Sequence, residues 1–422
     1  MTSIKAYLLA AVMLWGLATA RAQKLSGGDI SMLPKYEQEG AAYFTHDGTP
    51  ITDLIAYSKQ VGMNAMRVRL FVNPDTNSDG NVCQDIAWVE SLGKRIKDAG
   101  MQFMLDLHYS DTWADPAKQW TPKAWSPLSD ADLAKQVYSY TASTLKQLKD
   151  AGAEPDLVQT GNEISYGMLW GREGGTLKQC WPSSPTAHWD RFAQLLTQAT
   201  KAVRATTPSA KIILHVERVS ISQQSDNAGY QALTHFFSKM KDYDIDYDVI
   251  GLSYYPYFHG ALSELDGAIG KLESNCPDKE IMVVETGYPY AWAVPGTTYD
   301  ATATWAYSDA GQKKFADDLM AMLNKHSHVN GLFWWWPEYN AKGTSLTGWY
   351  NAPLFDSSTG RATSAFTELG RFATGTTDIT QATRTATAAT AGNRYYDLTG
   401  KATTHPRGKG IYIHHNKKTM LP

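Results

Sequence analysis

The stretch that decides the fold is Asp156 to Ser165, DLVQTGNEIS. The apolar pair Leu157 and Val158 has the character of a short buried strand, and it runs within a few residues into Asn162 and Glu163. An acidic side chain next to a buried strand needs a reason, because burying a charge costs free energy. In α/β barrels the reactive groups lie at the carboxyl ends of the strands, so a carboxyl group just after a strand would belong to the active site.

Seven more stretches of this kind recur along the chain and alternate with longer amphipathic segments. The eight predicted strands are Gly28–Ser31, Ala65–Phe71, Gln102–His108, Leu157–Glu163, Lys211–Val216, Val249–Tyr255, Ile281–Glu285 and Gly331–Trp335. Between them, stretches such as DIAWVESLGKRIKDAG repeat apolar residues at helical spacing and end on glycine. Eight strands separated by helices predict an α/β fold, namely a (β/α)8 TIM barrel with a short C-terminal tail.

The two ends of the chain differ from its middle. Residues 1–22 carry the basic residue Lys5 near their start, followed by an apolar run from Ala6 to Ala20. The run is followed by a small-x-small site, so the sequence predicts a signal peptide cleaved after Ala22. The apolar run is shorter than the ~20 residues that span a bilayer. We therefore expect a secreted protein (periplasmic, cell-surface or extracellular) without a transmembrane segment.

The rest of the chain divides into three parts. The catalytic barrel is predicted over residues 23–373, a Thr/Ala-rich linker over residues 374–392, and a short C-terminal β-like tail over residues 393–422. The tail is too short to bury a core of its own. It either pairs with another protein or has no role in the fold.

Composition narrows the class of partner. With 39 Lys and Arg against 42 Asp and Glu the net charge is −3, so no basic surplus points to nucleic acid or an anionic membrane. Aromatic residues make up 12% of the chain, which suits stacking on a neutral substrate but also suits a core. We expect a monomer. The three cysteines, Cys83, Cys180 and Cys276, allow at most one disulfide, and no Cys/His cluster indicates zinc.

Polar side chains gather where the predicted strands end, although an apolar barrel interior would normally exclude them. The candidate site residues are Arg67, Arg69, Asp106, His108, Asp111, Trp113, Asn162, Glu163, His215, Glu217, Tyr255, Glu285 and Trp335. Any single Arg, His or Asp in this set is more simply read as a satisfied structural residue. Glu163 and Glu285 differ, because both end strands that lie across the ring from one another. Two carboxyl groups facing across a cleft are what glycoside hydrolysis requires.

The chemistry assigns a role to each carboxyl group. One must be protonated to help the leaving oxygen depart, and the other must be ionised to attack the anomeric carbon. We expect Glu163 to be the proton donor and Glu285 the nucleophile, with their carboxyl groups about 5 Å apart. Arg69, with Arg67 as the second candidate, would keep one of them ionised.

Two neighbours complete this hypothesis. Asn162 would hydrogen-bond the 2-hydroxyl group of the sugar, and Tyr255 would donate to the nucleophile and aim it.

These motifs resemble a known family. The stretches GGDISMLP, MNAMRVRLFVNP, LDLHYSDTWADPAKQ, VQTGNEISYGMLW, VIGLSYYPYFHG and VVETGYPY are together similar to the endo-β-1,4-galactanases of glycoside hydrolase family 53, from about Gly27 to about Phe372. The resemblance implies a retaining endo-acting enzyme that cuts β-1,4-galactan, as in the type I arabinogalactan of pectin. It implies the same roles for Glu163 and Glu285, and it places His108, Asp111 and Trp113 near the cleavage point.

The sequence departs from the family pattern at two strands. Family members commonly have His-x-Asp at the fifth strand, where this chain has His215-Val216-Glu217. At the eighth strand Trp336 replaces a carboxylate, while Trp335 keeps the position of the Trp that would floor the cleavage subsite. The resemblance implies no required cofactor. It leaves a structural calcium open, but residues 289–307 carry no dense carboxylate cluster.

Two other functions remain open at this point. The same two glutamates would serve another retaining endo-glycanase, such as a mannanase or a cellulase. A barrel of this kind that binds carbohydrate without cleaving it is less favoured, because both carboxyl groups are present. The products formed from a panel of polysaccharides would separate the three.

Overall fold

The computed structural model describes residues 23–76, 79–180, 188–217, 219, 228–340 and 352–374, together with four short strands between residues 395 and 421. The predicted signal peptide (1–22) and almost all of the predicted linker (374–392) lie outside the described residues. The chain divides into two compact units, Met1–Thr374 and Gly375–Pro422. This division falls one residue from the predicted boundary between barrel and linker.

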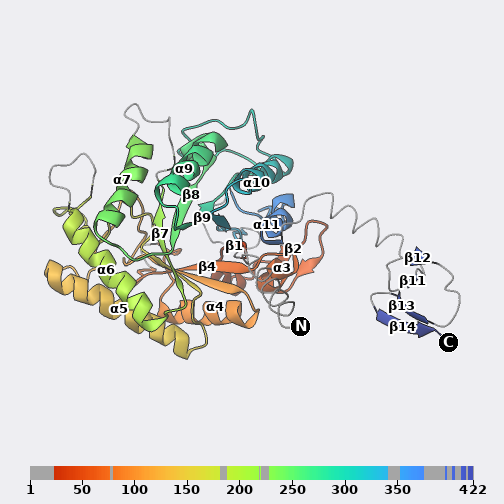
Figure 1. The fold of residues 1–422 in the computed structure, drawn as a ribbon, viewed down its shortest axis with the longest axis horizontal. Helices are drawn as coiled ribbons and strands as arrows, with labels where there is room; N and C mark the ends of the chain where they lie inside the picture. The colour runs from red at the N-terminus through yellow and green to blue at the C-terminus, as the bar shows by residue number, and fades with distance from the viewer. Residues whose placement is uncertain are drawn as a thin grey trace, which may run out of the picture. The chain divides into compact units, whose positions relative to one another are not determined.

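The first unit is built on a closed barrel of eight parallel strands with helices on its outside (Figure 1). The strands neighbour one another in the order β1-β10-β9-β8-β7-β6-β5-β4. They are β1 (Leu25–Asp29), β4 (Ala65–Leu70), β5 (Gln102–Leu107), β6 (Leu157–Thr160), β7 (Lys211–Val216), β8 (Val249–Tyr254), β9 (Glu280–Thr286) and β10 (Val329–Trp335). The predicted TIM barrel is confirmed, and each predicted strand overlaps one observed strand.

Helices follow the strands and cover the barrel. They are α2 (Leu33–Gln38), α3 (Leu54–Gln60), α4 (Ile86–Asp98), α5 (Asp130–Asp150), α6 (Trp189–Thr206), α7 (Ala228–Asp242), α8 (Pro256–His259), α9 (Leu262–Asn275), α10 (Asp309–Leu323) and α11 (Ser364–Thr374). Helix α4 shows how the sequence sets their limits, because Asp85 caps its first turn and Gly100, at φ +67°, turns the chain after its end. Its apolar stripe faces the barrel.

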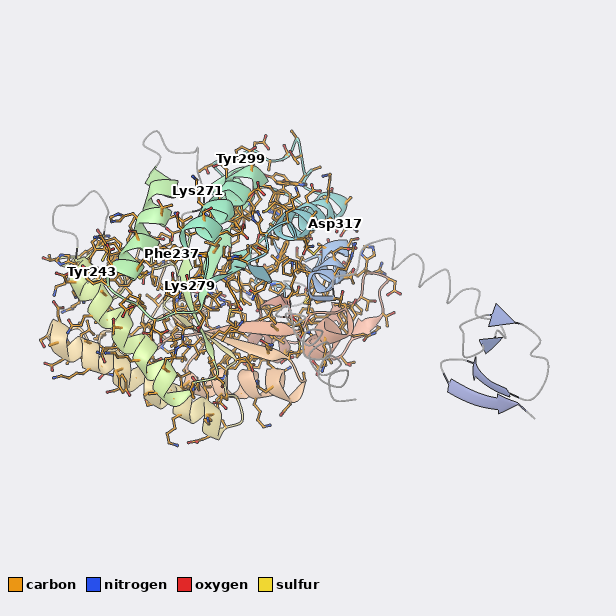
Figure 2. All side chains as sticks on the ribbon, in the orientation of Figure 1. Phe237, Tyr243, Lys271, Lys279, Tyr299 and Asp317 are labelled. Atoms are coloured by element: carbon orange, nitrogen blue, oxygen red, sulfur yellow. The ribbon has the colours of Figure 1, made fainter. Side chains whose placement is uncertain are left out.

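Two apolar layers hold the barrel together. Side chains between the strands and the helices form the larger core, and Figure 2 shows them filling this space around Phe237 on α7. Inside the barrel a smaller cluster closes the lower end, with members from all eight strands: Leu25, Ala65, Met104, Leu157, Ile213, Val249, Met282, Val284 and Phe333. Above this plug the inward positions turn polar, so the polar groups are confined to the carboxyl ends of the strands.

Smaller elements complete the described structure. A two-stranded antiparallel sheet joins β2 (Tyr43–Phe44) and β3 (Pro50–Ile51). In the second unit, β11 (Tyr395–Tyr396), β12 (Ala402–Thr403), β13 (Gly410–His414) and β14 (Lys417–Leu421) form a sheet in the order β12-β11-β13-β14. None of the helices in the described parts of the chain has the length and apolar character needed to cross a membrane.

Candidate active site

Glu163 does not end a regular strand, contrary to the sequence-based expectation. Strand β6 stops at Thr160, and the chain then turns through Gly161 at φ +107° and Glu163 at φ +48°. A left-handed conformation at a residue with a Cβ is strained, and such strain is found mostly at functional sites. The turn is held from outside, since Ile164 N–H donates to the carbonyl of His215 (2.9 Å) and Gln119 Nε2 donates to the carbonyl of Asn162 (2.8 Å).

Glu285 lies within β9, but this strand is irregular at the same point. Between Val283 and Thr286 the strand carries one residue more than both of its neighbours, β8 and β10. An extra residue of this kind is a β-bulge, which re-aims the side chains beside it. In the barrel order two strands, β7 and β8, separate β6 from β9, so the two glutamates project toward the mouth from nearly opposite walls.

A buried arginine organises the floor between them. The guanidinium group of Arg67, 1% exposed, donates through Nη1 to Asp29 Oδ2 (2.9 Å) and through Nη2 to Asp106 Oδ2 (2.8 Å). Nη2 also lies 2.9 Å from Oε1 of Glu285 and donates to Asn162 Oδ1 (2.9 Å). One cation thus serves three carboxylates, which keeps buried negative charges paired.

Glu285 receives two donors, which favour its ionised form. Arg67 faces its Oε1, and the hydroxyl group of Tyr255 donates to its Oε2 at 2.9 Å. Burial raises the pKa of Glu285. Arg67 and Tyr255 oppose that rise without cancelling it, so the pKa stays above its ordinary value. Tyr255 itself stays protonated, since burial and the neighbouring Glu285 raise its pKa well above the ordinary value. The predicted role of Tyr255, a donor that aims Glu285, matches this geometry.

Glu163 has the opposite electrostatic surroundings. Its Oε1 accepts a hydrogen bond from Ser253 Oγ (2.6 Å), which is a neutral donor. Burial raises the pKa of Glu163 well above its ordinary value, and the negative charges of Glu285 and Glu217 raise it further. The side chain is nevertheless only half-buried. The pKa values of both carboxyl groups are raised, but that of Glu163 is raised well above its ordinary value, so Glu163 is the better placed of the two to carry a proton.

Arg69 does not pair with either glutamate, so the first-named candidate for that role was wrong. Its Nη1 donates to Asp29 Oδ1 (3.1 Å), and its guanidinium carbon lies 4.6 Å from the ring centre of Trp113 and 5.1 Å from that of Trp336. Arg67 and Arg69 both point into the barrel, but only Arg67 contacts Glu285. Arg69 instead supports an aromatic wall through cation–π contacts.

That wall lines one side of the mouth. Trp113 and the half-buried Trp335 make an edge contact with ring centres 6.3 Å apart, and Trp335 contacts Trp336 at 5.1 Å. Trp113 Nε1 donates to Asp79 Oδ2 (2.9 Å), which ties the wall to the loop after β4. Trp335 is half-buried, and the subsite floor expected of it stays a prediction. The buried Trp336, at φ +59°, backs Arg69.

His108 and Asp106 form a second buried pair. His108 Nε2 lies 3.0 Å from Asp106 Oδ2, and its Nδ1 accepts from the backbone N–H of Ala114 (3.1 Å). Burial raises the pKa of Asp106, but Arg67 and His108 outweigh it and hold that pKa below its ordinary value. These residues position the floor and the loop of Trp113 rather than face the mouth directly.

Asn162 and Asp111 both make hydrogen bonds within the protein. Asn162 Nδ2 donates to the carbonyl of Ala114 (2.8 Å), while its Oδ1 accepts from Arg67, so the amide is tied to the floor. Asp111 accepts from the backbone N–H of Lys123 (2.8 Å) and so braces the loop between β5 and α5. The sugar contact expected of Asn162 remains a prediction.

His215 and Glu217 flank the acid. His215 is fully buried between Asn162, Gln159 and Ser253, and burial and then the charge of Arg67 lower its pKa well below the ordinary value. Glu217, 6% exposed, accepts from Ser165 Oγ (2.7 Å) and contributes charge to the environment of Glu163. The longer acid at this position therefore does reach the site electrostatically.

Several contributing residues were absent from the sequence-based list, among them Asp29, Gln119, Gln159 and Ser253. Asp29 and Gln159 are buried polar residues on β1 and β6, and alternation from the predicted strand positions would have placed both inside the barrel. Gln119 sits in the long loop after β5, where no periodicity applies. Ser253 is small and uncharged, so only its partners reveal it.

Metal and cysteine chemistry find little support in the described parts of the chain. There, no group of three or more His, Cys, Asp or Glu side chains could hold a metal ion. In the loop after β9, Asp300 accepts from the backbone and hydroxyl groups of Thr302. Part of the loop after β10 lies outside the described residues, so the calcium expectation stays a prediction. Cys83, Cys180 and Cys276 are all free thiols.

Comparison with known proteins places this barrel in a family. The family model described as glycosyl hydrolase family 53 matches residues 25–369. The chain belongs to that family. The resemblance drawn from the motifs is thereby confirmed, and the protein is a glycoside hydrolase.

Family 53 relatives agree along most of the chain. The endo-beta-1,4-galactanase of Bacillus subtilis strain 168 is 32% identical over 327 residues, 75% of this chain and 70% of that protein. The arabinogalactan endo-beta-1,4-galactanase of Cellvibrio japonicus is 34% identical over 350 residues, 78% of this chain and 86% of that protein. Among solved structures, the Ignisphaera aggregans GH53 catalytic domain superposes with a TM-score of 0.70 at 28% identity, covering 85% of this chain and 98% of that chain.

Proposed function

We propose that this protein is a retaining endo-β-1,4-galactanase that hydrolyses galactan, including the type I arabinogalactan of pectin. The observation that carries the proposal is the contrast between the two carboxyl groups at the mouth of the barrel. Glu285 receives a cation and a phenol, whereas Glu163 receives one neutral hydroxyl and faces negative charge. The activity named for the family 53 relatives supports galactan as the substrate.

In the first step Glu163 gives its proton to the glycosidic oxygen while the bond from that oxygen to the anomeric carbon breaks. The electron pair of this bond stays on the leaving oxygen. At the same time a carboxylate oxygen of Glu285 forms a bond to the anomeric carbon, which yields a covalent glycosyl-enzyme. Arg67 and Tyr255 keep Glu285 ionised and aimed for this attack.

In the second step Glu163, now ionised, acts as the base. A water molecule attacks the anomeric carbon and gives a proton to Glu163, and the bond to Glu285 breaks with its electron pair returning to the carboxylate. Both enzyme groups regain their starting states, and the sugar keeps its β-configuration. Such a double displacement needs the carboxyl groups about 5–5.5 Å apart.

Galactan is neutral, and its sugar rings have apolar faces. Stacking on aromatic side chains is the interaction that suits it, which fits the half-buried Trp113 and Trp335 beside the carboxyl pair. Trp125 and Trp170 are buried, so they pack in the hydrophobic core and do not offer a stacking surface.

The test is a digest of debranched galactan by the purified mature chain, with products separated by size and their fresh anomeric configuration read by NMR. Short galacto-oligosaccharides that appear first as the β-anomer are expected. The α-anomer would replace retention by inversion. Turnover of mannan or cellulose with none of galactan would keep the two glutamates and discard the substrate, and binding without any turnover would favour a carbohydrate-binding barrel.

Export, cofactor use and oligomeric state complete the proposal. The basic start and short apolar run of residues 1–22 support a cleaved signal peptide and a secreted protein. N-terminal sequencing of the exported protein should begin at Gln23. We expect full activity after dialysis against a chelator, because neither proposed step needs a cofactor. Light scattering should give the mass of a monomer.

A further inference from the structure

Ser253 lies between the acid and a buried histidine. It is the fifth residue of β8, fully buried, and its Oγ donates to Glu163 Oε1 at 2.6 Å. The same Oγ lies 2.8 Å from His215 Nε2. One hydroxyl group has a single hydrogen, so the direction of these two hydrogen bonds depends on which nitrogen of His215 carries a proton.

Three groups around Nδ1 of His215 bear on its tautomer. The backbone N–H of Glu163 (3.3 Å) and Nε2 of Gln159 (3.0 Å) donate, whereas Oδ1 of Asn162 (3.0 Å) accepts. Asn162 Oδ1 already accepts from Arg67 Nη2 (2.9 Å) and lies 3.1 Å from Gln159 Nε2, so it does not need a hydrogen from the ring. The backbone N–H of Glu163 can only donate, so we assign Nδ1 as the acceptor and place the hydrogen of the neutral ring on Nε2. Burial keeps the ring neutral, as described above.

A closed ring of hydrogen bonds results. His215 Nε2–H donates to Ser253 Oγ, Ser253 O–H donates to Glu163 Oε1, and the backbone N–H of Glu163 donates to His215 Nδ1. The ring joins the strained main chain of Glu163 to its own side chain. Its backbone at φ +48° and its carboxyl group are therefore fixed by the same imidazole.

We infer that Ser253, oriented by neutral His215, is a positioning residue that reserves Oε1 of Glu163 as an acceptor and so leaves Oε2 to give and take the catalytic proton. This inference rests on the proposed function. No proton passes through Ser253 in either step, because its hydroxyl hydrogen stays on Oγ throughout. The same ring serves both steps, since Oε1 is an acceptor whether Oε2 is protonated or ionised.

The electrostatic groups that face Glu163 set the sign of the test. Glu285 on β9, Glu217 after β7 and Asp115 in the loop after β5 all raise the pKa of Glu163, in addition to burial. The Ser253 hydroxyl lowers that pKa because it stabilises the ionised form. Removing the hydroxyl should therefore raise the pKa, whereas a loosened site that admits water should lower it.

The experiment compares Ser253→Ala, Ser253→Thr and the wild type by the pH dependence of kcat/KM on a galacto-oligosaccharide. In Ser253→Ala the alkaline limb should move to higher pH and kcat should fall about 10- to 100-fold, the range for a hydrogen bond to a charged group. The loss should be small for a dinitrophenyl β-galactobioside, whose leaving group needs no proton. Ser253→Thr should restore both. Ser165→Ala, which removes a similar buried hydroxyl from Glu217, is the matched control and should not move the limb upward.

An alkaline limb that stays in place or moves down in Ser253→Ala would overturn the inference, as would equal losses for good and poor leaving groups. If Ser253→Ala does not fold, the tautomer of His215 in the wild type decides. Nitrogen-15 spectra of the histidine-labelled protein should show His215 neutral with its proton on Nε2, and a proton on Nδ1 would refute the ring. This reading needs no turnover, so it separates failure of the inference from failure of the proposed galactanase activity.

Discussion

Glu163 and Glu285 are the same residue type at the same mouth, yet the barrel treats them in opposite ways. Glu285 sits in a bulged strand and receives a guanidinium group and a phenol. Glu163 sits beyond the end of its strand in a left-handed turn and receives one serine hydroxyl while it faces two other carboxylates. The fold thus gives two glutamates different neighbours, in charge and in number, as the proposed roles of nucleophile and acid require.

The difference also shows what the irregular backbone is for. A regular barrel strand points its side chains alternately inward and outward, which does not by itself bring two carboxyl groups from distant strands toward one substrate bond. The extra residue in β9 and the positive φ of Glu163 redirect one group each. Both departures from ideal geometry occur at the two residues on which the proposed chemistry depends.

The largest expected effect comes from neutralising each carboxyl group. Glu285→Gln should lose more than about 10⁴-fold in kcat because no covalent intermediate can form, and Glu163→Gln should lose about 10²- to 10⁴-fold, the usual contribution of a general acid. Thermal unfolding should change little, since both side chains keep their shape. Activity on galactan and a melting curve provide the measurement.

Azide sharpens this contrast between the two positions. With Glu285→Ala and an activated substrate, added azide should restore turnover and give a glycosyl azide of inverted configuration. With Glu163→Ala the azide product should keep the β-configuration, because Glu285 still forms the intermediate. The reverse pattern would exchange the two roles.

Arg67→Met should have the next largest effect. It would leave Asp29, Asp106 and Glu285 buried without their shared cation, which should cost about 3–5 kcal/mol of unfolding free energy. The pKa of Glu285 should rise, and the acidic limb of kcat/KM should move to higher pH with it. Arg95→Met is the control, because that arginine pairs with Glu37 at the exposed surface and should cost no more than about 1 kcal/mol. Similar losses of unfolding free energy in both variants would show that Arg67 does not organise the buried carboxylates.

Tyr255→Phe tests the phenol side of the same carboxyl group with a smaller change. The variant keeps the ring and removes the donor to Glu285 Oε2, so kcat should fall about tenfold or somewhat more. The donor stabilises the ionised form, and its loss should therefore raise the pKa of Glu285 and move the acidic limb upward. Tyr290→Phe, which loses a hydroxyl contact to Ser357, should leave that limb in place. Kinetics over a pH series distinguish the two variants.

The sequence predicted the barrel and the carboxyl pair because both leave periodic or positional signals. Eight apolar runs alternate with amphipathic segments, and Glu163 and Glu285 each stand next to one of those runs. Strand limits near the site were less accurate, since the positive φ at Glu163 is a tertiary effect with no local pattern.

The interaction partner of a side chain was harder to predict than its position in the barrel. Arg67 and Arg69 share a strand face, so alternation could not tell which of them reaches Glu285; the answer lies in Asp29 and in the two tryptophan rings around Arg69. Ser253 shows the same limit. A serine in a strand gives no signal of its own, and its place became visible only with the acid on one side and the imidazole on the other.

Glu217→Gln should give the smallest effect, and its direction is informative. The negative charge of Glu217 helps to raise the pKa of Glu163, so removing it should lower that pKa and move the alkaline limb of kcat/KM to lower pH. The shift is opposite to the one expected for Ser253→Ala, although both residues adjoin Glu163. Glutamine keeps an oxygen for Ser165, so kcat at the optimum should change by less than about tenfold.

Asp115→Asn calibrates this last measurement. Asp115 also raises the pKa of Glu163, but it is a weaker contributor than Glu217 and is half-buried in a loop. Its variant should move the alkaline limb in the same direction by a smaller amount. If Glu217→Gln leaves the limb unchanged while Asp115→Asn moves it, then beyond burial and Glu285 the further rise in the pKa of Glu163 comes from Asp115 rather than from Glu217. In that case the longer acid after His215 has no part in making Glu163 differ from Glu285.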